Sequence, residues 1–222
     1  PKRVKKIKKD LESKGVKYIY SNWIDFLGSP KTKPMPISDF EDLCAGKGPQ
    51  FAVHSVSFVP ELTPADNDQI PVPDLDSLVI CPWDKTCAWV FADLYWNDKP
   101  YDVCPRMTLK RQIKKCEKSD LKFFVGIEPE FFLMKWDGDK PVKAIDRDPI
   151  PLRRQAFGYD AEYSIDGMNF LKEIIDILNN DLKWDLHDVV AEGAYGQYEL
   201  DFGYTDILSM ADRFVFLRVL LK

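Results

Sequence analysis

One short stretch, Gly126-Ile127-Glu128-Pro129-Glu130-Phe131-Phe132, decides how this sequence is interpreted. We expect it to lie in an apolar β-strand over residues 123–134. Side chains two residues apart in a strand project from the same face, so Glu128 and Glu130 are predicted neighbours. Apolar side chains share that face, and carboxylates among them cost free energy unless cations neutralise them. Pro129 donates no ladder hydrogen bond, which favours an edge strand, a strand end or a bulge. A charged edge that discourages aggregation is the alternative.

A second pair of carboxylates is predicted in the segment AEGAYGQYE, residues 191–199. A turn at Tyr195-Gly196 would place Glu192 opposite Glu199, and cross-strand partners point to the same side of a hairpin. Like charges in that position repel each other. A hard divalent cation such as Mg²⁺ or Mn²⁺ would remove the repulsion, because it prefers oxygen ligands. A solvent-exposed hairpin without a ligand is the alternative. Two carboxylate pairs favour a metal site of the kind that handles phosphates.

The pattern along the rest of the chain predicts an α+β fold. Over about the first 100 residues, a helix at 2–14 precedes strands at 16–25 and 32–37. The second half carries an amphipathic helix at 167–179 before the hairpin. We also expect strands at 50–59, 78–82 and 86–94, helices at 108–118 and 205–221, and proline-containing loops at 60–76 and 136–160.

Composition excludes several classes of protein. The chain has 222 residues, with 31 Lys and Arg against 36 Asp and Glu, so a nucleic-acid or membrane-surface partner is not expected. A two-metal nuclease is disfavoured because no basic groove is indicated. The five cysteines never form a CxxC pair, which predicts a reduced, cytoplasmic protein. Only His54 and His187 are present, which argues against a zinc hydrolase or a histidine triad. Because the chain ends at Lys222 inside an apolar run, we expect it to be part of a longer protein.

The two carboxylate segments, in this order and with a helix between them, resemble the glutamine synthetase family of ATP-dependent amide ligases. Gly126 to Phe132 is similar to its G-x-E-x-E-F-F strand, and Glu192 to Glu199 to its E-x-x-x-G-Q-x-E segment. Pro105-Arg106 resembles the entry to the catalytic domain. Residues 200–204 with the later Ala211-Asp212 resemble the stretch leading into the next long helix. The resemblance implies an N-terminal β-grasp domain over residues 1–104, then the first part of an α/β barrel-like catalytic domain over 105–222.

The resemblance also implies roles for individual residues. Glu130, Glu192 and Glu199 match the first metal site of the family, and Glu128 matches one ligand of the second, with Mg²⁺ or Mn²⁺ as the ions. Contacts to ATP are implied at four further positions, although a plain strand end and a surface histidine are the alternatives there: His187, Phe202, Gly203 and Tyr204.

The implied reaction joins glutamate to an amine through a γ-glutamyl phosphate made from ATP. The implied assembly is a homo-oligomeric ring, a dodecamer of two hexamers. Near the family's ammonium-binding aspartate this chain reads His54-Ser55-Val56-Ser57, without an obvious carboxylate, and Asp66 and Asp68 further on are the candidates to replace it. An organic amine is therefore favoured, with ammonia, as in glutamine synthetase itself, or a non-catalytic scaffold as alternatives. The remaining ligands and the glutamate-binding arginines would follow Lys222, so residues 1–222 alone are expected to be inactive.

Overall fold

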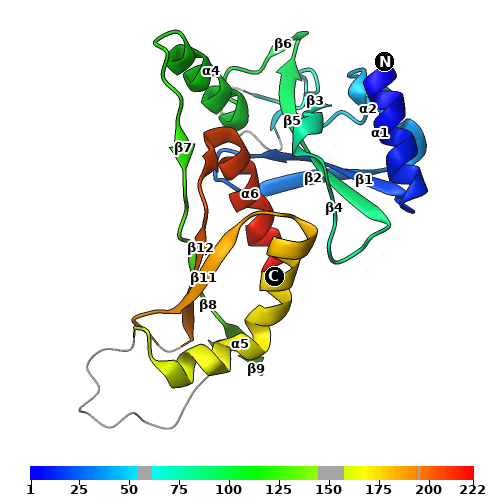
Figure 1. Cartoon of the computed structure of the whole chain (residues 1–222). Coiled ribbons are helices and arrows are strands. Elements are labelled where there is room, and N and C mark those ends of the chain that lie inside the picture. Colours follow the sequence, from blue (N-terminus) through cyan, green and yellow to red (C-terminus); the bar gives the residue numbers. More distant parts are fainter. Residues whose placement is uncertain (55–61, 145–157, 195) are drawn as a thin grey trace. The chain divides into compact units, whose positions relative to one another are not determined.

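The computed structural model describes residues 1–54, 62–144, 158–194 and 196–222 (Figure 1). These form two compact units. Unit 1 comprises Pro1–Phe123 with Ile207–Leu220 and Lys222, and unit 2 comprises Phe124–Asp206 with Leu221. The predicted domain boundary between residues 104 and 105 falls within unit 1 and stays a prediction, because compactness and family domains are different definitions. None of the helices in the described ranges combines the length and the apolar character needed to cross a membrane.

Unit 1 is built on a mixed six-stranded sheet whose main path runs β2-β1-β5-β3. β1 and β5 are parallel, and the other pairs are antiparallel. The long central strand β5 is almost fully buried, which fits its β-branched, aromatic and small residues. The six strands are β1 (Tyr18–Ile24), β2 (Pro30–Pro36), β3 (Ile70–Pro73), β4 (Val79–Ile80), β5 (Cys87–Trp96) and β6 (Lys99–Pro100).

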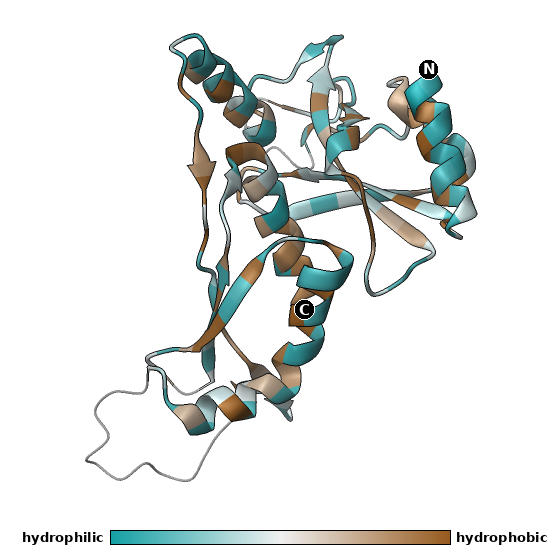
Figure 2. Cartoon of the chain, in the orientation of Figure 1, coloured by the Kyte–Doolittle hydropathy of each residue, from teal (hydrophilic) through white to brown (hydrophobic). Residues whose placement is uncertain are grey.

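Helices cover this sheet and close its core. Helix α1 (Lys2–Ser13) is hydrophilic over most of its surface, and its apolar stripe packs with α2 (Phe40–Cys44) on β1 and β5 (Figure 2). Helix α6 (Ile207–Leu220) is largely hydrophobic and buries Met210, Phe216 and Leu217. The other helical elements in the described part of unit 1 are η1 (Ile37–Asp39), η2 (Leu75–Ser77) and α4 (Pro105–Glu117).

Unit 2 is centred on a three-stranded antiparallel sheet in the order β11-β12-β8. Helix α5 lies beside β11 and covers one face of this sheet (Figure 1). The remaining strands form two separate two-stranded pairs. The elements are β7 (Phe124–Val125), β8 (Glu130–Phe132), β9 (Met134–Asp137), β10 (Lys140–Lys143), α5 (Ala161–Asp176), η3 (Ile177–Asp181), β11 (Leu186–Ala191), β12 (Gln197–Phe202) and β13 (Thr205–Asp206).

The packing of α5 on the sheet depends on one glycine. A Cβ at Gly167 would overlap the ring of Tyr198, so glycine lets the helix approach β12 closely. The Tyr198 hydroxyl donates a 2.9 Å hydrogen bond to the Tyr163 carbonyl on the first turn of α5. Asp160 caps the same turn by accepting from the backbone N–H groups of Glu162 and Tyr163. Together these contacts hold α5 against the face of the sheet opposite the candidate site.

The structure corrects five local predictions. The strand expected at 123–134 is divided, because Pro129 and its neighbours leave a gap between β7 and β8. The loop expected at 136–160 contains the β9–β10 hairpin, and the loop expected at 60–76 contains β3. Helix α5 begins six residues before the predicted start at Gly167. In the strand expected at 50–59, Phe51 makes only an isolated bridge to Gln69, and residues 55–59 lie outside the described ranges.

Candidate metal centre

The three-stranded sheet of unit 2 brings two carboxylate pairs together. Glu130 on β8 lies directly opposite Glu199 on β12. The same register continues beyond the end of β8, because Leu200 N–H donates to the Pro129 carbonyl and Phe202 N–H donates to the Ile127 carbonyl. Asp201 is therefore opposite Glu128. All four carboxylates project from one face, since they alternate with the residues that carry these backbone bonds.

The opposite face of this sheet is apolar. Tyr198, Ala191 and Leu133 are buried there against α5, with Phe131 partly buried beside them. Because side chains alternate along a strand, burying these residues forces Glu130, Glu199 and Asp201 to the other face. The hydrophobic core thus positions the carboxylates.

The predicted register of Glu192 is wrong by two residues. Val190, not Glu192, lies opposite Glu199, and Glu192 N–H donates a 2.9 Å bond to the Gln197 carbonyl. The turn is wider than expected, with a further bond from Gln197 N–H to the Ala194 carbonyl. A shift of two residues preserves the face of a strand, so Glu192 still meets Glu199 as a diagonal neighbour.

Two groups of three carboxylates result from this arrangement. The first group consists of Glu130, Glu192 and Glu199, and one carboxylate oxygen of each lies within 4.8 Å of the other two. In the other, Glu128, Glu199 and Asp201 meet the same condition. The sequence predicted every member except Asp201, whose spacing of two residues from Glu199 was the available signal. Asp188, which pairs with Asp201 across β11 and β12, was also not predicted.

Burial and neighbouring carboxylates raise the pKa values of Glu199 and Asp201. Partial burial and the neighbouring carboxylates of Asp201 and Glu192 raise the pKa of Glu199 to about 7. Burial and Asp188 raise the pKa of Asp201. Among the described residues, no Lys or Arg side chain forms an ion pair with either group of three. The nearest neutral donor is Gln197, whose Nε2 gives a 2.6 Å hydrogen bond to Glu130 Oε2.

The donor set fits Mg²⁺ or Mn²⁺. Every member offers a carboxylate oxygen, the ligand type that these hard cations prefer. Asp201 Oδ1 is buried without a hydrogen-bond partner, as expected of an oxygen whose natural partner is a cation. When bound, such an ion acts as a Lewis acid on phosphoryl oxygens. The chain's contribution is to hold the carboxylates in place before the ion arrives.

The residues predicted to contact ATP lie at one end of β11 and β12. His187 Nε2 is 3.2 Å from Asp185 Oδ2, and a Cβ at Gly203 would overlap that Asp185 carboxylate. Tyr204 is 75% exposed, and its ring meets Phe124 edge-on. Phe202 is buried at the strand end. His187 and Gly203 are therefore close in space, and Tyr204 follows Gly203 directly in the sequence. Their contact with ATP stays a prediction.

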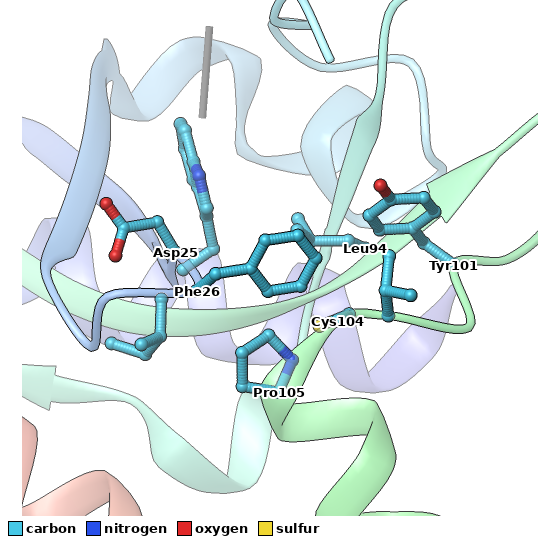
Figure 3. Close-up of a pocket in the computed structure, with 9 residues that line it drawn as sticks. Asp25, Phe26, Leu94, Tyr101, Cys104 and Pro105 are labelled. Carbon is cyan, nitrogen blue, oxygen red and sulfur yellow. The ribbon is translucent and has the colours of Figure 1, made fainter. Parts of the chain in front are cut away.

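Unit 1 contains a pocket that does not suit a substrate. Figure 3 shows Phe26, Tyr101 and Pro105 around it, with the Asp25 carboxylate pointing away from the Phe26 ring. The cavity measures about 10 Å³, room for a single water. The Asp25 carboxylate stabilises the β1–β2 turn, because it accepts hydrogen bonds from the backbone N–H groups of Leu27 and Ser29.

Comparison with known proteins finds glutamine synthetases and a glutamate–methylamine ligase. The chain is 32% identical over 209 residues to a glutamine synthetase of Rhizobium meliloti (strain 1021), covering 94% of this chain and 46% of that one. It is 28% identical over 214 residues to a glutamate–methylamine ligase of Methyloversatilis universalis, with the same coverage of 94% and 46%. The chain therefore spans about half the length of these curated relatives.

A solved structure agrees with these relatives. A GmaS/ADP complex superposes with a TM-score of 0.85 at 28% identity, covering 97% of this chain and 48% of that chain. The model of the glutamine synthetase catalytic domain matches residues 102–222, which contain both groups of carboxylates. On this evidence the chain belongs to the glutamine synthetase family.

Proposed function

We propose that the protein is an ATP-dependent ligase that joins glutamate to an amine. The observation that supports this best is the carboxylate face of unit 2, where Glu130, Glu192 and Glu199 form one cation site and Glu128 extends it. The relatives include both a glutamine synthetase and a glutamate–methylamine ligase. In this proposal residues 1–104 form a β-grasp domain, residues 105–222 begin the catalytic domain, and the working enzyme is a homo-oligomeric ring.

The proposed chemistry has two steps. An oxygen of the glutamate γ-carboxylate attacks the γ-phosphorus of ATP, which forms γ-glutamyl phosphate and releases ADP. The amine nitrogen then attacks the acyl carbon, inorganic phosphate leaves, and the nitrogen loses a proton as the amide forms. Negative charge gathers on phosphoryl oxygens in the first step, so a site that concentrates cations supplies electrostatic stabilisation.

The nucleotide is proposed to lie near the end of β11 and β12. His187 is held by Asp185 there, and the lack of a side chain at Gly203 lets the Asp185 carboxylate lie against the backbone. The exposed ring of Tyr204 offers a flat surface on which a base can stack. Phe202, being buried, supports this end of the strand rather than presenting a free ring.

An organic amine is the favoured second substrate. The motive is the segment from His54 to Ser57, which lacks the carboxylate expected near the ammonium site; Ser55 to Ser57 lie outside the described residues. Asp66 accepts from the Thr63 backbone N–H, so its carboxylate is already used locally. Ammonia is the second candidate, and the identity of 32% to a glutamine synthetase favours it.

The test is an ADP-release assay on the full-length protein with ATP, Mg²⁺, glutamate and a panel of amines that includes ammonia. We expect release to require both glutamate and an amine, and some alkylamine to give a higher kcat/KM than ammonia. Hydroxylamine should trap the acyl phosphate as a hydroxamate. No glutamate-dependent release with any amine would reject the ligase proposal, whereas a clear preference for ammonia would reject only the choice of amine.

The carboxylate face is tested with one variant and a matched control. Glu130→Gln should lower kcat by about 10²-fold or more, the size of effect seen when one electrostatic contact to a transition state is lost. Glu173→Gln, on the exposed side of α5, makes the same chemical change outside the site and should leave kcat unchanged. Equal activity of the two variants would contradict the assignment.

A further inference from the structure

We propose that Asp201 is a ligand of a second divalent cation, which it holds together with Glu128 and Glu199. This inference rests on the proposed function, because it concerns the same metal centre. The family resemblance assigns only Glu128 of this chain to a second ion. The structure places two more carboxylates, those of Glu199 and Asp201, beside Glu128. Residues 124–206 therefore offer three ligands for the second ion, where the motifs indicate one.

The position of Asp201 follows from the backbone. Asp201 lies between Leu200 and Phe202, whose N–H groups donate to Pro129 and Ile127 at 3.2 and 3.4 Å. These bonds fix Asp201 opposite Glu128 on the carboxylate face. Since Glu199 and Asp201 are two residues apart on β12, they also share that face. One oxygen from each of the three residues lies within 4.8 Å of the others.

The surroundings of the Asp201 carboxylate favour a bound cation. Its Oδ1 is buried and accepts no hydrogen bond. Asp188 lies opposite it across β11 and β12, and the negative charges of Asp188 and Glu128 act against its own. No Lys or Arg of the described ranges forms an ion pair with any of these groups. Buried carboxylate oxygens are normally hydrogen-bonded, paired or bound to metal, and metal is the partner that this donor set fits.

Glu199 belongs to both groups of three, which places it between the two proposed ions. Metal pairs that act on phosphates lie about 3.5–4 Å apart, a separation that one shared carboxylate can span. The centre then divides into Glu130 and Glu192 on one side, Glu128 and Asp201 on the other, and Glu199 in common. Each side can be removed separately by mutation.

The experiment counts Mn²⁺ ions bound to the full-length protein by calorimetry and by electron paramagnetic resonance. We expect two ions in the unmodified protein, with spectra that show coupling between neighbouring manganese ions. Asp201→Asn and Glu128→Gln should each retain one ion, weaken the second at least tenfold and abolish the coupling. Asp139→Asn, in the exposed β9–β10 turn, makes the same change as Asp201→Asn elsewhere in unit 2 and should retain two coupled ions.

The outcomes separate this inference from the proposed function. Two coupled ions of unchanged affinity in Asp201→Asn would overturn the role of Asp201 while leaving the ligase proposal intact. A single ion in the unmodified protein would likewise overturn the inference alone. No bound manganese in any sample would reject the whole metal centre. Circular dichroism of each variant checks folding, and loss of the same ion in Glu128→Gln supports the assignment even where Asp201→Asn folds poorly.

Discussion

Arg106 at the start of α4 and Asp212 in α6 form a two-pronged ion pair, although they are 106 residues apart in the sequence. Arg106 Nε donates to Asp212 Oδ1 at 3.0 Å, and Nη2 donates to Oδ2 at 2.8 Å. The same guanidinium also binds Asp93 and Asp74, and Lys110 binds both of those aspartates. This cluster joins α4, α6, β5 and the turn before η2 within unit 1.

Arg106→Leu should lower the free energy of unfolding by about 3–5 kcal/mol. The Arg106 side chain is only 6% exposed, so its removal leaves three aspartates facing one lysine in a largely buried place. Arg106→Lys should also destabilise, because an ammonium group cannot make the paired contact to Asp212. Urea unfolding at pH 7 measures the effect.

Arg111→Leu on the same helix is the control. Arg111 is 41% exposed and its ion pair with Asp102 spans 3.9 Å, so the loss should stay below about 1 kcal/mol. If Arg111→Leu destabilises as much as Arg106→Leu, the helix substitution itself is responsible and the cluster is not.

Without metal, the free energy of unfolding should fall as pH rises, because of the carboxylates at the metal centre. The pKa of Glu199 is about 7 in the folded chain against a usual 4.5. Between these values the folded chain keeps a proton that the unfolded chain has released, so stability is full below about 4.5 and is lost as pH rises through about 7. Thermal unfolding in chelator, from pH 4.5 to 8, should show a falling midpoint.

Two further measurements connect that slope to Glu199 and to metal. Glu199→Gln should flatten the slope, because the amide does not titrate. Mn²⁺ should raise the midpoint strongly at pH 8 and little at pH 5, since protons compete with metal for the same oxygens. A slope that survives Glu199→Gln would assign it to another group.

Gly167→Ala tests the close contact between α5 and β12. Alanine favours a helix over glycine by up to about 1 kcal/mol. However, its Cβ would overlap the Tyr198 ring, and overpacking of this kind costs about 1–3 kcal/mol. The overlap should win, with a net loss of about 1–2 kcal/mol on denaturant unfolding. Gly158→Ala, where the added Cβ meets no atom of the described residues within 4 Å, should change stability by less than about 0.5 kcal/mol.

Much of the candidate site could be predicted because strands have a period of two. That period placed Glu128 beside Glu130, and it kept Glu192 on the correct face although its register was wrong by two residues. The same period, counted two residues on from Glu199, would have added Asp201 to the predicted ligands. The β9–β10 hairpin also had a local signal, the Gly138-Asp139 pair in its two-residue turn, which the nearby prolines outweighed.

Other features had no local signal. The division of the strand at Pro129 depends on which carbonyl groups receive hydrogen bonds from the N–H groups of β12. That pairing joins residues about 70 positions apart in the sequence. The ion pair of Arg106 with Asp212 is equally non-local, since helix periodicity shows that each residue lies on a helix but not which helices meet. Both features depend on tertiary packing rather than on propensity.

The last prediction is that residues 1–222 alone do not catalyse ligation. The chain spans 46% of the glutamine synthetase to which it is 32% identical. Among the described residues, β8 pairs only with β12, and nearby apolar side chains such as Phe132 and Met134 are about half exposed. An open edge beside exposed apolar groups favours aggregation over assembly into a working site. Purified residues 1–222 should therefore release no phosphate that depends on ATP and glutamate, under conditions in which the full-length protein turns over. Phosphate release by the short chain that disappears in its own Glu130→Gln variant would show instead that this half is sufficient for catalysis.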